Sequence, residues 1–167
     1  MLASGRTYVY GGGSHEPHLL NVFTDDPPAV LDCGGDSAMF LTRRGNVYRY
    51  DLEGERLEAV AADLAEGDVI RGIAAGSDFV YVLLSDGTLK CRGKNKCGQL
   101  ATLDEKERKE FTFVEPLGMY QVRQIACGTQ HCAAVVEISG ASAGLLTRGL
   151  YAEEEKSHGI EAEDGFI

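Results

Sequence analysis

Four basic side chains alternate along one short segment of this chain: Lys90, Arg92, Lys94 and Lys96. Alternate residues of a strand point to the same face, so we expect these cations to gather at a strand end and along the loop that follows it. Such a cluster is suited to contact with an acidic partner. It is equally typical of an exposed sheet edge that lysines protect from pairing with other chains.

Two further groups of residues resemble chemical sites in composition. His15 and His18 offer two imidazoles, but Pro17 lies between them and no third ligand is near in sequence, so a surface loop is the better interpretation than a metal site. Cys127 and His131 match a nucleophile and a base, yet nothing in the sequence identifies the electropositive pocket that a reactive thiolate needs. We therefore expect no catalytic residue, no metal site and no cofactor.

The elements that carry these residues repeat with an offset of 42 residues. The same spacing separates Gly34, Gly45 and Asp51 in one unit and Gly76, Gly87 and Gly93 in the next. Each unit is expected to contain three short strands. Between the second and third strands, Asp86-Gly87 predicts a β-hairpin, because glycine accepts the positive φ that a tight antiparallel turn requires.

A third unit begins at Val122 and extends to Gly149, and a partial copy at the start of the chain repeats the spacing from Gly5 to Gly11. We expect a repeat domain over residues 1–151, divided into a partial unit at about 4–29 and units at 30–69, 70–121 and 122–151. An acidic, flexible tail over 152–167 follows. The acidic residues from 51 to 68 read as a solvated loop, and residues 103–109 as an exposed loop or one short helix.

The second and third units resemble the repeats named after the regulator of chromosome condensation. Ile125-Ala126-Cys127-Gly128 is followed by His131, and Asp86-Gly87 is followed by Gly93-Lys94-Asn95-Lys96-Cys97-Gly98-Gln99-Leu100, in the order and spacing of that family. The resemblance covers about Val30 to Gly149. Arg92 stands where the family usually has Trp, and Ala101 replaces the final Gly of the motif. The resemblance implies a structural role for the repeat positions Gly34, Gly45, Gly76, Asp86, Gly87, Gly93, Asn95, Gly98, Gln99, Gly128, His131 and Gly149.

The family folds as a β-propeller, and the apolar run Phe79–Leu84 agrees with a strand covered on both faces by stacked blades. We expect an all-β fold, an incomplete β-propeller in the form of an open arc of about three to four blades of antiparallel strands. Propellers need about 4 to 8 blades. The chain is therefore a fragment or truncated product, an open arc whose ends a partner covers, or an unusually small ring, and the first two are favoured.

A net charge of -10 and a pI near 4.8 argue against nucleic acid as a partner, because phosphate binding depends on Lys and Arg. The five cysteines are an odd number and sit mostly in strand positions, which is typical of reduced thiols in a cytoplasmic or nuclear protein. The start of the chain does not read as a signal peptide. No apolar run is long enough to span a membrane.

We therefore expect a non-catalytic protein–protein interaction module that acts in a larger assembly. Its partners are proteins that cap or read the arc, and self-association through the exposed end strands is a further expectation. The resemblance implies two alternatives. One is a guanine-nucleotide exchange factor for a small GTPase, since the founding member acts on Ran. The other is a chromatin-associated binding protein. The family's exchange residues have no recognisable match in this sequence.

Overall fold

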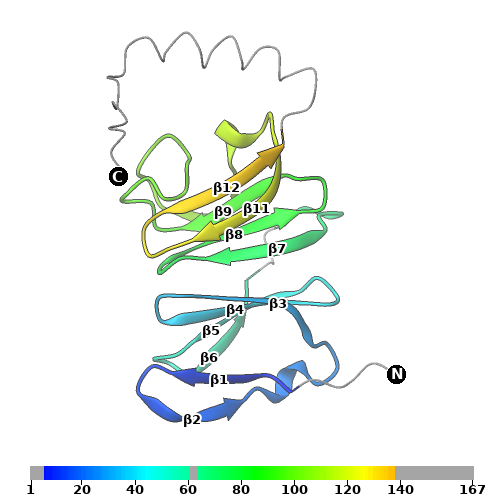
Figure 1. Ribbon diagram of the computed structural model, residues 1–167, viewed down its shortest axis with the longest axis vertical. Helices are drawn as coiled ribbons and strands as arrows, with labels where there is room; N and C mark the ends of the chain where they lie inside the picture. The colour runs from blue at the N-terminus through cyan, green and yellow to red at the C-terminus, as the bar shows by residue number, and fades with distance from the viewer. Residues whose placement is uncertain (1–5, 61–63, 138–167) are drawn as a thin grey trace, which may run out of the picture. The chain divides into compact units, whose positions relative to one another are not determined.

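The computed structural model describes residues 6–60 and 64–137, and this part of the chain is nearly all strand. Its strands form four antiparallel sheets (Figure 1). The first sheet pairs β1 (Tyr8–Gly11) with β2 (Ser14–Leu19). The second contains β3 (Pro28–Gly34), β4 (Ser37–Thr42), β5 (Val47–Asp51) and β6 (Arg56–Ala59) in that order.

The third sheet contains β7 (Ile70–Ala75), β8 (Phe79–Leu84), β9 (Leu89–Gly93) and β10 (Arg108–Phe113). The fourth pairs β11 (Gln121–Cys127) with β12 (Cys132–Glu137). Two short 3-10 helices, η1 (Asn21–Phe23) and η3 (Glu115–Leu117), lie in connections between sheets. We name the sheets in chain order the N-terminal half-blade, blade 1, blade 2 and the C-terminal half-blade.

The architecture is an incomplete β-propeller, because the four sheets stack face to face without closing into a ring among the described residues. The second strand of each complete blade shows the stacking most clearly. In β8, Val80, Val82 and Leu84 pack against blade 1, whereas Phe79 and Tyr81 pack toward the C-terminal half-blade. A strand buried on both faces needs apolar residues at every position, and β4 and β8 are buried along their whole length.

The three units keep the same register, which supports the repeat read from the sequence. The hairpins β3–β4, β7–β8 and β11–β12 each shift register once, between Pro28 and Val30, Ile70 and Gly72, and Val122 and Gln124. Adjacent blades approach closely at their first strands. The Asp32 carboxylate accepts a hydrogen bond from the Ala75 N–H at 2.8 Å, and a Cβ built on Gly34 would lie 2.4 Å from the Gly76 carbonyl oxygen.

The turns between second and third strands place glycine where the backbone demands it. Gly45 has a φ of 87° and Gly87 a φ of 89°, which is strained for other residues. The Asp86 carboxylate tightens the second turn, because it accepts hydrogen bonds from the Thr88 N–H at 2.8 Å and the Thr88 hydroxyl at 2.9 Å. The hairpins thus form where the paired glycines predict them.

The expectation of three strands in each unit is wrong, because both complete blades have a fourth strand. The missed strands, β6 and β10, are largely exposed and rich in charged residues. Their charged residues led us to read these segments as loops, although Leu57 and Ala59 alternate with Arg56 and Glu58 in β6. For the same reason β2, which includes His15, Pro17 and His18, was expected to be a surface loop and is instead the outer strand of the N-terminal half-blade.

Some expectations lie outside the described residues. They are Gly149, the end of the third unit and the acidic tail over 152–167. No helix in the described part of the chain is long and apolar enough to cross a membrane.

Candidate protein-contact loop

The connection between β9 and β10, residues 94–107, is the longest loop between strands within either complete blade. In an antiparallel meander, connections alternate between the two ends of the strands. This loop therefore lies at the same end of blade 2 as the turn from β7 to β8, and the Lys94 ammonium reaches the Asp78 carboxylate of that turn at 3.2 Å. We call residues 94–107 the contact loop.

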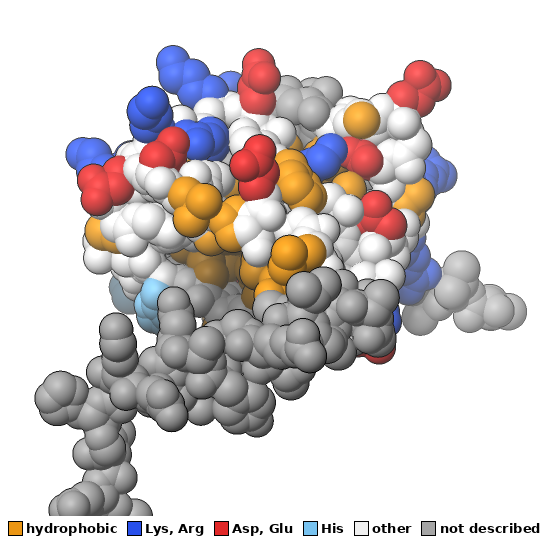
Figure 2. Space-filling view, turned by 90° about the horizontal axis from the view of Figure 1, so that it is seen from above, with side chains coloured by type: hydrophobic (Ala, Val, Ile, Leu, Met, Phe, Trp, Pro, Cys, Tyr) orange, Lys and Arg blue, Asp and Glu red, His pale blue; other side chains and the backbone are white. Residues whose placement is uncertain are grey.

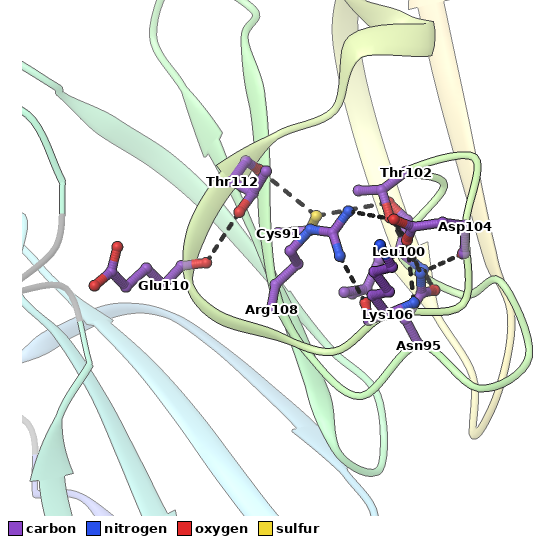
Figure 3. Close-up of polar contacts among 9 residues, drawn as sticks. All are labelled: Cys91, Asn95, Leu100, Thr102, Asp104, Lys106, Arg108, Glu110 and Thr112. Atoms are coloured by element: carbon purple, nitrogen blue, oxygen red, sulfur yellow. Dashed lines mark hydrogen bonds and ion pairs between the residues drawn. The ribbon is translucent and has the colours of Figure 1, made fainter.

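Asn95 holds the contact loop together from within (Figure 3). Its side chain is only 1% exposed. The amide oxygen accepts a hydrogen bond from the Leu100 N–H at 2.8 Å, and the amide nitrogen donates to the Asp104 carbonyl at 2.6 Å and the Thr102 hydroxyl at 3.1 Å. One buried side chain thus connects the start of the loop to three later residues in it.

An ion pair extends this network to the start of β10. The Arg108 guanidinium donates to the Asp104 carboxylate at 2.9 Å. The carboxylate also accepts hydrogen bonds from the Lys106 N–H and the Thr102 hydroxyl, both at 3.1 Å. These bonds, that of Arg108 above all, stabilise the charged form and lower the pKa of Asp104 to about 2.

The base of the loop is anchored in the core between blade 2 and the C-terminal half-blade. Leu100 is fully buried, and the Tyr81 hydroxyl donates to the Gln99 carbonyl at 2.7 Å. The Cys91 thiol lies against the carbonyls of Leu100 and Thr112, at 3.6 Å from each, and burial raises its pKa to about 12. This thiol therefore behaves as a small core residue rather than as a nucleophile.

The loop carries a backbone feature that the sequence did not reveal. Ala101 has a φ of 52° and Leu103 a φ of 59°, in the left-handed region that non-glycine residues seldom adopt. Ala101 stands where the resembled family has glycine, which accepts this conformation without strain. Leu103 is 86% exposed, so this hydrogen-bonded loop presents a large apolar side chain to solvent. Sequence reasoning did not single out Leu103, since single exposed leucines carry no distinctive pattern.

The structure separates the four basic residues into two pairs. Lys90 lies in a salt bridge with Asp68 at 2.5 Å, and the Arg92 guanidinium donates to the Val60 carbonyl at 3.5 Å beside a cavity of about 150 Å3 between blades 1 and 2. Lys94 and Lys96 are exposed in the contact loop. The strand β9 is not a sheet edge, as one interpretation of these lysines supposed, because it lies between β8 and β10.

The remaining sequence candidates are scattered. The His131 ring packs under Gly128, where a Cβ would lie 2.4 Å from it, and the Cys127 sulfur lies 3.1 Å from that of Cys132 instead. Both thiols are free, and the hydrogen bond between them, together with burial, raises the pKa of Cys127. A nucleophilic thiol needs a lowered pKa instead. His18 stacks against Tyr50 with ring centroids 6.5 Å apart. Within the described ranges no cluster of three or more His, Cys, Asp or Glu side chains is placed to hold a metal ion.

Comparison with known proteins agrees with this geometry. The family model described as Regulator of chromosome condensation (RCC1) repeat matches residues 70–99, which span blade 2 from β7 to the Asn95 turn. Among similar proteins are the serine/threonine-protein kinase Nek9 of Mus musculus, 26% identical over 73% of this chain, and the mitochondrial RCC1 domain-containing protein RUG3 of Arabidopsis thaliana, 30% identical over 81%. The RCC1-like G exchanging factor-like protein of Mus musculus is 27% identical over 73% of this chain. This chain spans only 15%, 33% and 29% of these three relatives.

Solved structures show the same fold. The crystal structure of human WBSCR16 matches with a TM-score of 0.61 and 27% identity, over 73% of this chain and 33% of that one. Prp20p from Saccharomyces cerevisiae matches with the same TM-score of 0.61 but 14% identity, over 82% of this chain and 37% of that one, and so shows likeness of fold alone.

Proposed function

Because the chain is a partial repeat protein of the regulator of chromosome condensation type, we propose that it is a non-catalytic protein-interaction module of a larger assembly. In this proposal the contact loop binds a partner protein. Lys94 and Lys96 supply charge, and Leu103 supplies an apolar anchor. Lys90 and Arg92 have a structural role in this proposal: Lys90 holds the segment before β7 through Asp68, and Arg92 reaches the Val60 carbonyl at the end of blade 1.

The observation that carries this proposal is the exposure of Leu103 in a loop that a buried side chain holds by hydrogen bonds. A leucine that is 86% exposed costs solvation free energy, and its left-handed backbone adds strain. The buried Asn95 network holds that conformation before any partner arrives. A preordered loop loses less conformational entropy on binding, and loops held by a rigid scaffold are where protein contacts commonly lie.

The chemistry of the loop indicates the kind of partner. Lys94 and Lys96 flank the Asn95 turn at the surface, so the matching surface should carry acidic side chains beside a small apolar pocket for Leu103. The charge of the whole chain, -10, argues against a nucleic-acid surface as the partner. We place this function in the cytoplasm or nucleus, in agreement with the five cysteines that the sequence analysis reads as reduced thiols.

The test is affinity capture from a cell extract with the intact chain and two contact-loop variants, Leu103→Ser and the pair K94E/K96E. Both variants should lose the captured protein, and K94E/K96E should do so most at low salt, where charge contacts are least screened. The matched control is R43E/R44E, which also reverses two exposed charges but lies in the β4–β5 turn at the opposite strand end. Equal capture by all variants contradicts a role for this loop.

A second candidate function is guanine-nucleotide exchange on a small GTPase, which the similarity to the RCC1-like G exchanging factor-like protein favours. This chain spans 29% of that relative, so the match supports shared repeats rather than shared activity. The direct test is release of labelled guanine nucleotide from Ran with and without the chain. If the chain accelerates nucleotide release and the K94E/K96E variant does so equally, exchange acts through another surface. If the chain does not accelerate nucleotide release, the interaction module is the favoured function.

A further inference from the structure

Two cysteines face each other at the turn end of the β11–β12 hairpin. Cys127 and Cys132 are directly opposite in register, both thiols are free and partly exposed, and their sulfurs lie 3.1 Å apart. The next pair toward the turn is hydrogen-bonded, because the Gly128 N–H donates to the His131 carbonyl at 2.8 Å. Pairs alternate along an antiparallel ladder, so the two cysteines form a non-hydrogen-bonded pair, in which Cα atoms lie about 4.5 Å apart. A disulfide accepts Cα separations of about 4.4–6.8 Å, so this pair can close without a rearrangement of the backbone.

The fold does not require thiols at these two positions. The equivalent opposed pairs in blades 1 and 2 are Cys33 with Ala38 and Ala75 with Val80. Small apolar side chains therefore serve equally well at this point of the hairpin. In the registers of the described sheets, no other two cysteines lie opposite each other.

The surroundings give the two thiols different roles. The hydrogen bond with the Cys127 thiol lowers the pKa of Cys132, and the Tyr81 hydroxyl adds to this effect, although burial acts in the opposite direction. The hydrogen bond with Cys132, burial and the Asp32 carboxylate all raise the pKa of Cys127. The thiolate is the nucleophilic form of cysteine, so Cys132 is placed to react first, with Cys127 protonated beside it.

Both sulfurs lie at the base of the contact loop. The two side chains pack against the core cluster that contains Tyr81. The Cys132 sulfur is 3.6 Å from the Gln99 carbonyl, which also accepts the hydrogen bond from the Tyr81 hydroxyl at 2.7 Å. Figure 2 looks down on the end of the described residues at which β12 lies and shows hydrophobic side chains, a class that includes Cys there, reaching the surface. A small oxidant can therefore approach this part of the hairpin.

We propose that Cys127 and Cys132 are a redox-active dithiol that a hydroperoxide oxidises to a reversible disulfide at the base of the contact loop. The Cys132 thiolate attacks one peroxide oxygen and the O–O bond breaks. Cys132 then carries a sulfenic acid, and the hydroxide that leaves takes up a proton to become water. Cys127 attacks the Cys132 sulfur, the S–O bond breaks, and the departing hydroxide takes the Cys127 proton as a second water. The two thiols thus give two electrons to one peroxide.

The properties of the pair fit a transient disulfide rather than a permanent one. Disulfides in reducing compartments are usually transient and redox-sensing, and the sequence indicates a protein of that kind. Thiol–disulfide exchange with a reductant restores both thiols. Closure also removes the S–H that faces the Gln99 carbonyl, so oxidation alters the base of the contact loop. This chemistry is independent of the function proposed for that loop.

Peptide mapping by mass spectrometry after treatment of the intact chain with equimolar hydrogen peroxide tests the bond. We expect a link between residues 127 and 132, the loss of two hydrogens, and recovery of both thiols with dithiothreitol. The matched control is Cys33→Ala, which removes a thiol at the position in blade 1 equivalent to Cys127 and should leave the link unchanged. A chain that stays unlinked, or that links through Cys33 or Cys97 instead, overturns the proposal.

Two variants test the roles of the thiols. Cys127→Ala and Cys132→Val introduce the residues that blade 2 already has at these positions, Ala75 and Val80, and circular dichroism checks that both fold. In Cys127→Ala the reaction should stop at a sulfenic acid on Cys132, which dimedone traps. In Cys132→Val oxidation of Cys127 should be slower on the order of tenfold or more, because its thiol stays protonated. Sulfenic acid on Cys127, or equal rates in the two variants, contradicts the assignment.

NMR of the intact chain tests the link to the contact loop. The Leu100 amide belongs to the same peptide group as the Gln99 carbonyl, so its signal should shift on oxidation and return on reduction. The Asn46 amide in the β4–β5 turn serves as the reference and should not move. If the disulfide forms and the Leu100 signal stays in place, oxidation does not reach the contact loop and that part of the proposal is wrong.

Discussion

Replacing Asn95 with alanine should unfold the protein at a markedly lower denaturant concentration. The variant removes the acceptor of the Leu100 N–H and the donor to the Asp104 carbonyl. Leu100 is fully buried, so no water can take the place of the lost acceptor there. A buried polar group without a partner costs about 1–3 kcal/mol, and the partly exposed Asp104 carbonyl adds roughly 1 kcal/mol.

The sum is about 2–4 kcal/mol, which corresponds to a fall in Tm of roughly 4–16 °C for a domain of this size. The assay is urea unfolding followed by far-UV circular dichroism, with the free energy of unfolding taken from the midpoint and slope. The matched control is Asn46→Ala, in which an exposed asparagine loses a hydrogen bond of 3.0 Å to Asp26. Water replaces that bond, so the control should lose less than about 1 kcal/mol.

Equal loss of stability in the two asparagine variants would refute the reasoning, because it would mean that burial does not set the cost. Asn95→Asp gives a second check. It keeps an oxygen for the Leu100 N–H but turns a carboxylate toward the Asp104 carbonyl. It should therefore be destabilised at pH 7 and recover part of that loss near pH 4, where the carboxyl protonates.

Gly87→Ala should destabilise the fold more than Gly45→Ala. Both backbones are left-handed, at φ of 89° and 87°, but only a Cβ at position 87 would meet β11, at 3.1 Å. Urea unfolding of the two variants measures the difference in stability. The contribution of Asp104 to stability should be fully present above about pH 4 and disappear as pH falls through about 2, since its pKa is lowered in the fold; NMR titration should show this pKa return toward 3.8 in Arg108→Ala. The Cys91 thiol has a pKa of about 12 and no exposed surface, so iodoacetamide at pH 8 should leave it unmodified while the exposed cysteines react. Reaction of Cys91 at the same rate as the exposed cysteines would contradict its burial.

The inner strands of each blade could be predicted because their information is local. A tight turn at Gly87 needs a positive φ, and burial on both faces needs an unbroken apolar run such as Phe79–Leu84. The outer strands could not. β6 and β10 each pair with only one neighbouring strand and are rich in charged residues, so in the sequence they resemble exposed loops. Only the pairing with β5 and β9 identifies them as strands.

Some features of the contact loop could likewise be predicted from the sequence, and others could not. The motif around Asn95 marked the segment as part of the repeat, and the alternating basic residues marked it as charged. Which of those residues reach solvent was not visible, because Asp68 and Val60, the partners of Lys90 and Arg92, precede them by more than twenty residues. The exposure of Leu103 was equally invisible, since it depends on how the Asn95 network folds the loop.

By itself the sequence determined that this chain is a partial repeat protein, because glycine spacing and apolar runs repeat at a fixed offset and each reflects a backbone requirement of a single hairpin. The tertiary structure alone decided which side chains reach solvent. Lys90 and Arg92 are held by Asp68 and the Val60 carbonyl, which precede them by more than twenty residues, whereas Lys94, Lys96 and Leu103 are exposed. These contacts join segments that are distant in the sequence, so they became visible only once the strands were paired and the blades stacked.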